Sequence, residues 1–128
     1  MHRLENIAFK LAWISLTTIG VAILIFGLIV AIWPFSSDPS YSRAIGVAYI
    51  GMGLFGTVIP VTAYRRAERW AWFALWYYPI FWSAHVLGRL PPDKDHVHQV
   101  VFIALSVAGL LTPVKRVFQH ERFSKVTN

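Results

Sequence analysis

Leu11–Trp33, LAWISLTTIGVAILIFGLIVAIW, is a run of 23 residues without a charged side chain. An α-helix rises about 1.5 Å per residue and the hydrocarbon core of a bilayer is about 30 Å thick, so this run can cross it. A cleaved signal peptide has an apolar stretch of only about 7–15 residues, followed by small residues. Because this run is longer and leads into Pro34 and Phe35, we predict a retained membrane span.

Three further apolar runs follow, at residues 44–64, 70–87 and 97–114, and each predicts another span. The last is clearly apolar only over the 15 residues from Val100 to Val114, and such a short run is also compatible with a re-entrant or interfacial segment. Short connections force neighbouring spans to run antiparallel. The predicted fold is therefore all-α: one domain of 128 residues, an antiparallel four-helix transmembrane bundle.

The basic residues indicate which way the bundle faces. Nine of the twelve Lys and Arg precede the first span, lie between the second and third, or follow the fourth. The positive-inside rule then places both termini in the cytoplasm. The nine are Arg3, Lys10, Arg65, Arg66, Arg69, Lys115, Arg116, Arg122 and Lys125, and the other three are Arg43, Arg89 and Lys94.

Composition agrees with a lipid environment. Charged residues make up 14% of the chain, against about 25% in soluble domains. The net charge of +6 lies at the ends of apolar runs, so the expected anionic partner is a phospholipid headgroup rather than nucleic acid. The chain has no Cys, which excludes disulfides, thiolate metal sites and Cys nucleophiles.

The second span carries small residues on one face. At about 100° per residue, five positions fall in one narrow sector, which favours close contact with another helix. We expect this partner to be another span of the same chain, with a second copy as the alternative. Pro79 and Pro113 predict kinks in the third and fourth spans. The five positions are Gly46, Tyr49, Gly53, Gly56 and Pro60.

Glu68 lies in a basic turn between the second and third spans. In the interpretation we favour, the arginines of this turn anchor to phosphate and Glu68 pairs with a neighbouring Arg. The functional alternative places Glu68 at the mouth of the bundle as an acid, a base or a cation-binding carboxylate, which requires it to face inward and be desolvated.

His85 is the only ionisable residue well inside a predicted span, which makes it a functional candidate. The competing interpretation is an interfacial His that bonds to a backbone carbonyl or to water. Haem held between two histidines of one subunit is not expected, because no other span carries a deep His partner.

The outer loop before the fourth span contains Asp93, Asp95, His96 and His98. Nitrogen and oxygen ligands of this kind suit a divalent metal such as zinc. We favour the simpler interpretation, in which Asp93 or Asp95 caps the fourth helix and the histidines lie at the interface.

The third span is rich in aromatic residues, and Trp72, Trp76, Tyr78 and Trp82 form a candidate apolar pocket. Aromatic walls with few polar groups suit lipids, quinones or other apolar molecules. The sequence has no Gly-rich phosphate loop and no hydrolase or metalloprotease motif. The leading hypothesis is a non-enzymatic bundle that binds a hydrophobic ligand or serves as an accessory subunit of a membrane assembly. The alternative is a small membrane enzyme or transporter that uses Glu68, His85 or the outer His/Asp loop.

The stretch from Tyr64 to Leu87 resembles one found in small prokaryotic four-helix membrane proteins. A basic turn, Arg65-Arg66-Ala67-Glu68-Arg69, leads into Trp70-Ala71-Trp72 and then to Pro79, Trp82 and His85. The resemblance implies a topology broadly similar to the DoxX-like group, in a prokaryotic cytoplasmic (inner) membrane. It implies no activity, cofactor or catalytic residue. Expected partners are membrane lipids and either further copies of the chain or a larger membrane complex.

Overall fold

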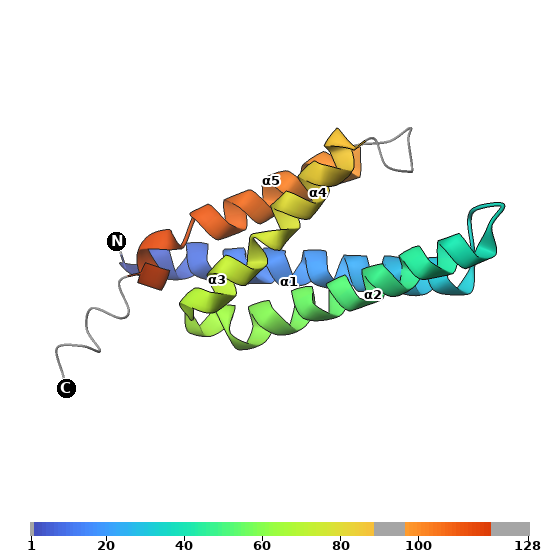
Figure 1. Ribbon diagram of the computed structural model, residues 1–128. Coiled ribbons are helices and arrows are strands. Elements are labelled where there is room, and N and C mark those ends of the chain that lie inside the picture. Colours follow the sequence, from blue (N-terminus) through green and yellow to red (C-terminus); the bar gives the residue numbers. More distant parts are fainter. Residues whose placement is uncertain (1, 89–96, 119–128) are drawn as a thin grey trace.

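The chain folds into helices packed side by side, as the computed structural model in Figure 1 shows. The structure describes residues 2–88 and 97–118, and this part of the chain contains no β-strand, which confirms the predicted all-α class. The elements are α1 (His2–Ile32), α2 (Pro39–Thr62), the short 3-10 helix η1 (Tyr64–Arg66), α3 (Arg69–Leu75), α4 (Tyr77–Leu87) and α5 (Val97–Leu111).

Two stretches, Arg3–Ile32 and Pro39–Arg66, are long and apolar enough to cross a membrane. The first begins well before the predicted span at Leu11, because hydropathy marks the apolar part of a helix and not its polar first turns. The second begins at Pro39, five residues before the apolar run. Asp38 caps it, with its Oδ1 accepting bonds from the backbone N–H groups of Ser40 and Tyr41 at 2.9 and 3.2 Å.

Helices α1 and α2 run antiparallel and approach so closely that backbone meets backbone. A Cβ added to Gly27 would lie 2.7 Å from the Ile50 nitrogen, and one added to Gly46 would lie 2.6 Å from the Ala31 nitrogen. Gly20 faces the backbone of Gly56 even more closely. The small-residue face of α2 is thus buried against other helices of the same chain, as predicted: Gly46 and Gly53 meet α1, and Gly56 also meets Tyr78 of α4.

The predicted third span is two helices that meet at Trp76. Pro79 has no N–H to donate to the carbonyl of Leu75, so the helical hydrogen bonds are interrupted one turn before the proline. Figure 1 shows the chain changing direction between α3 and α4. Likewise α5 ends at Leu111, two residues before Pro113, and residues 114–118 resume a helical conformation. Both predicted proline interruptions are confirmed.

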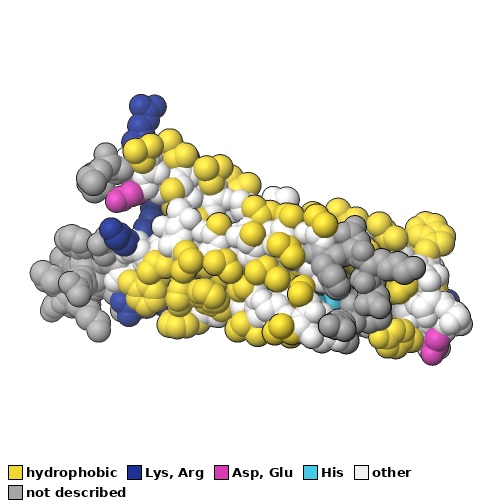
Figure 2. All heavy atoms as spheres, turned by 90° about the horizontal axis from the view of Figure 1, so that it is seen from above, with side chains coloured by type: hydrophobic (Ala, Val, Ile, Leu, Met, Phe, Trp, Pro, Cys, Tyr) yellow, Lys and Arg dark blue, Asp and Glu magenta, His cyan; other side chains and the backbone are white. Residues whose placement is uncertain are grey.

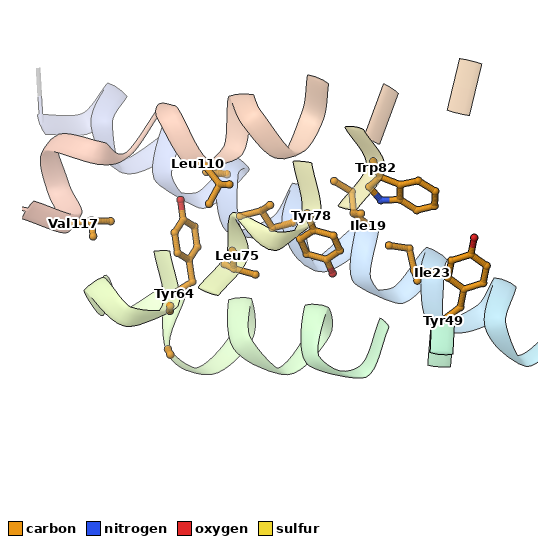
Figure 3. Packing of buried hydrophobic residues seen from close by; sticks show 13 residues of the cluster. Ile19, Ile23, Tyr49, Tyr64, Leu75, Tyr78, Trp82, Leu110 and Val117 are labelled. Atoms are coloured by element: carbon orange, nitrogen blue, oxygen red, sulfur yellow. The ribbon is translucent and has the colours of Figure 1, made fainter. Parts of the chain in front are cut away.

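Most of the buried apolar side chains form one cluster that runs along the axis of the bundle (Figure 3). Two aromatic side chains from η1 and α3 form hydrogen bonds with the backbone of α5. The Tyr64 hydroxyl donates to the carbonyl of Gly109 at 2.7 Å, and the Trp72 indole N–H donates to the carbonyl of Leu110 at 2.9 Å. Gly109 lies four residues before Pro113, so its carbonyl lacks its usual helical partner and Tyr64 supplies the replacement.

The outer surface carries many large apolar side chains. Figure 2 shows them spread along the length of one face, with most of that face's Lys and Arg at one end. No Asp, Glu, Lys or Arg occurs at residues 11–37, 44–64, 70–87 or 97–114. Apolar residues more than 40% exposed include Ile25, Ile29, Val47, Phe55, Ile80 and Leu105.

Candidate functional site

A cavity of about 350 Å³ lies where α1, α2, α4 and α5 face one another. Phe26 of α1 lines it and is also 47% exposed. The other lining residues are Ala22 and Ile23 of α1, Tyr49 of α2, Trp82 of α4, and His98, Gln99 and Phe102 of α5.

Trp82 is the central side chain of this wall. It is 4% exposed, and its ring lies 5.3 Å from that of Phe102 and 6.3 Å from that of Tyr49, to which it is nearly parallel. Tyr78, Trp82 and His85 follow one another at intervals of four and three residues, which places them on one face of α4. In Figure 3, Trp82 and Tyr49 lie at the same end of the buried cluster, near Ile23.

Few polar groups border the cavity. The Tyr49 hydroxyl lies 3.3 Å from Nε2 of His85, so the predicted candidate His85 has a side-chain partner on another helix. Gln99 is fully buried in the same wall. The buried indole N–H of Trp82 has no hydrogen-bond partner among the described residues. An unpaired buried donor costs about 1–3 kcal/mol relative to one that is satisfied.

The aromatic residues predicted to form a pocket separate into two groups. Trp82 lines the cavity, whereas Trp72, Trp76 and Tyr78 are not among its lining residues. Trp72 packs edge-on against Trp76 and Phe118 at the other end of the bundle. Tyr78 is fully buried, with its hydroxyl against Gly56 of α2. These three side chains therefore hold helices together.

Glu68 lies at the opposite end of the α3–α4 segment from His85, immediately before α3. Its carboxylate accepts a hydrogen bond from the indole N–H of Trp70, two residues away in the chain. The Glu68 carboxylate therefore takes part in a local contact at the end of the bundle where η1 lies. Arg65 is stacked over Trp13, with its guanidinium 5.6 Å from the ring centre.

Of the proposed metal ligands, Asp93, Asp95 and His96 lie outside the described residues, and His98 lies in the first turn of α5. The His98 ring is 6.3 Å from that of Trp82, at the edge of the cavity. Within residues 2–88 and 97–118, no three His, Asp or Glu side chains come together in a way that could hold a metal ion.

Sequence reasoning missed Phe26, Gln99 and Phe102 as parts of this site. Gln99 carried a readable signal, because a Gln beside a long apolar run is costly in lipid unless it faces the protein interior. Phe26 and Phe102 carried none, since nothing distinguishes them from phenylalanines that face outward. Tyr49 was identified only as a packing residue.

Comparisons with protein-family models, with curated proteins and with solved structures find no match to this chain. A function for the chain is therefore inferred from its architecture and from the chemistry of the cavity.

Proposed function

We propose that this chain is an integral membrane protein in which α1, α2, the α3–α4 segment and α5 each cross the bilayer. The support is the outer surface, where large apolar side chains are exposed along stretches that contain no charged residue. Such a surface is unfavourable in water and suited to hydrocarbon. Most of the backbone in these stretches is helical, which satisfies its hydrogen bonds internally as lipid requires, and the Tyr64 hydroxyl satisfies the carbonyl of Gly109.

The basic residues at one end of the bundle determine the orientation that we propose for it in the membrane. The turn at η1 carries Arg65 and Arg66, and Arg116 lies at the same end of the bundle, 4.4 Å from the ring centre of Phe9. The connection between α1 and α2 lies at the other end (Figure 1). We assign the basic end to the cytoplasm.

Within this bundle, we infer that the function is to bind a small apolar molecule in the cavity at Trp82. The observation that carries the proposal is the cavity itself: about 350 Å³, bounded by four helices and lined mainly by aromatic and aliphatic side chains. Pockets that bind small molecules have volumes of about 300–1,000 Å³ and the same apolar character. We place the entry route from the hydrocarbon of the bilayer beside Phe26, which lines the cavity and is 47% exposed.

Binding is favoured over catalysis because the ionisable candidates are not assembled. Glu68 and His85 lie at opposite ends of the α3–α4 segment. His85 is paired with the Tyr49 hydroxyl, and the residues that line the cavity include no Ser, Thr, Lys, Asp or Glu that could act as a nucleophile.

The test is to fill the cavity and ask whether a bound molecule is lost. Native mass spectrometry of the full chain, released from its own membrane in mild detergent, should detect a non-covalent adduct. The Ala22→Phe variant places a ring in the cavity and should lose it. The Val21→Phe variant, one residue away at a 37% exposed position, should keep it.

Thermal unfolding of both variants controls for damage to the fold. An adduct that survives in a folded Ala22→Phe variant would place binding elsewhere. The lack of any adduct in the unchanged chain would count directly against a ligand-binding role.

A further inference from the structure

We propose that Arg65 and Arg116 form a binding site for the headgroup of one anionic phospholipid at the basic end of the bundle. This inference rests on the proposed placement of the chain in a membrane and is independent of the cavity at Trp82. It starts from two guanidiniums that lie over aromatic rings of α1. Arg65 is 5.6 Å from the ring centre of Trp13, and Arg116 is 4.4 Å from that of Phe9.

The two rings bring the two arginines to neighbouring positions. Phe9 and Trp13 are four residues apart in α1, so they share one face of the helix on successive turns, with Cβ atoms about 5–6 Å apart. The ring of Tyr64, the residue before Arg65, lies 5.9 Å from that of Phe9, so η1 packs against this same face. One lipid headgroup can therefore reach both guanidiniums.

Stacking holds these side chains in place and leaves their donors for a ligand. A guanidinium over a ring uses its flat face, and its five N–H donors project from its edge. Arg116 donates one hydrogen bond to Oδ1 of Asn6, and neither Arg65 nor Arg116 forms an ion pair with an Asp or Glu among the described residues. Phosphate oxygens complement this arrangement, because a guanidinium can bind two of them side by side.

Both arginines lie at the depth of a lipid phosphate. Arg65 directly follows the uncharged stretch 44–64, and Arg116 comes two residues after the end of the stretch 97–114. In the proposed bundle these stretches lie in hydrocarbon, so the basic residues that follow them lie at the level of the headgroups. Both arginines are exposed, so a lipid can reach them while its acyl chains lie along the apolar outer surface (Figure 2).

The surrounding charges favour an anionic headgroup over a zwitterionic one. The structure describes seven Lys and Arg at this end of the bundle, against Glu5 and Glu68, and the Glu68 carboxylate already accepts a hydrogen bond from Trp70. The choline group of phosphatidylcholine would add a further cation here, whereas the glycerol group of phosphatidylglycerol adds none. The preferred lipid is therefore one whose phosphate carries its only charge. The seven basic residues are Arg3, Lys10, Arg65, Arg66, Arg69, Lys115 and Arg116.

Lipid titration of the purified full chain tests this, with native mass spectrometry from detergent as the readout. The buffer is about 0.15 M ammonium acetate, in which diffuse attraction is screened beyond about 8 Å. We expect one phosphatidylglycerol to bind about tenfold more tightly than phosphatidylcholine with the same acyl chains. Diacylglycerol, which has no phosphate, should bind most weakly. This comparison uses the unchanged chain and needs no variant to fold.

Matched neighbours distinguish a specific site from diffuse attraction. Arg65→Gln and Arg116→Gln should each weaken phosphatidylglycerol binding about tenfold. Arg66→Gln and Lys115→Gln remove the same charge from adjacent exposed positions, over no ring of the described residues, and should weaken it less than about threefold. Arg65→Lys keeps the charge without the planar group and should also weaken binding. Thermal unfolding checks that each variant is folded.

Equal losses in all four Gln variants would show diffuse attraction and overturn the site. Equal affinities of the unchanged chain for phosphatidylglycerol and phosphatidylcholine would overturn the preference for an anionic lipid. Neither result would affect the membrane placement. Recovery of the chain in the soluble fraction without detergent would overturn that placement and this site with it.

Two competing locations and sources of the phosphate remain as outcomes of the same titration. Ala22→Phe, which fills the cavity, should leave phosphatidylglycerol binding unchanged, and a loss in the folded variant would place the lipid in the cavity instead. Glycerol 1-phosphate, which has the phosphate without acyl chains, should not displace the lipid at millimolar concentration. Displacement would assign the two arginines to a soluble phosphate compound and overturn the lipid site.

Discussion

The two halves of the bundle are packed in opposite ways. Between α1 and α2, glycines bring backbones together, with Gly20 against Gly56 and Gly53 against Leu24. Between the α3–α4 segment, α5 and that pair, contact is made by large rings such as Tyr64, Trp72 and Trp82. Backbone contact leaves no space between helices, whereas rings of fixed shape fill an irregular gap incompletely. The cavity occurs where the aromatic half meets the glycine half.

This contrast predicts that the glycine half tolerates substitution least. Gly20→Val would push two methyl groups into the backbone of Gly56, which cannot move without separating the helices. We expect the free energy of unfolding in detergent to fall by about 3 kcal/mol or more. Denaturant titration of the purified variant measures this.

Gly51 is the matched control, since a Cβ there meets no atom within 4 Å. Gly51→Val should be neutral or slightly stabilising, because Val is a better helix former than Gly. Equal losses at the two positions would show that helix propensity, rather than contact between α1 and α2, governs the effect.

In the aromatic half, Tyr64→Phe should lower the free energy of unfolding by about 2 kcal/mol, because the carbonyl of Gly109 loses the hydrogen bond that replaces the one Pro113 cannot make. The same unfolding measurement tests it. Tyr41→Phe, at a 51% exposed ring, should have little effect. In a Pro113→Ala background the cost of Tyr64→Phe should shrink, since an ordinary helical N–H becomes available. An unchanged cost there would contradict this role for Tyr64.

The smallest effect is expected at Ala67, which connects the two halves. Its φ of 60° is in the left-handed region, the sole non-glycine case among the described residues. Ala67→Gly should remove this strain and raise the free energy of unfolding by up to about 1 kcal/mol. A decrease would mean that the Ala67 methyl group contributes packing that outweighs the strain.

The contrast also explains what the sequence could predict. The buried face of α2 was readable because glycines at helical spacing leave few interpretations, and Pro79 and Pro113 marked the interruptions because proline lacks an N–H. The cavity could not be predicted from the sequence. It depends on how α5 is aligned with α1 and α2, which no periodicity encodes, so Trp82 was identified while Phe26 and Phe102 were not.

We propose above all that the chain is inserted in the membrane with the basic end of its bundle in the cytoplasm. Because the chain contains no Cys, Ser37→Cys in the α1–α2 connection and Arg66→Cys in η1 each report one position. Treating intact cells with a membrane-impermeant maleimide should label the Ser37→Cys variant, whereas the Arg66→Cys variant should react only after lysis. Labelling of both variants in intact cells, or recovery of both in the soluble fraction without detergent, would contradict the proposed membrane bundle.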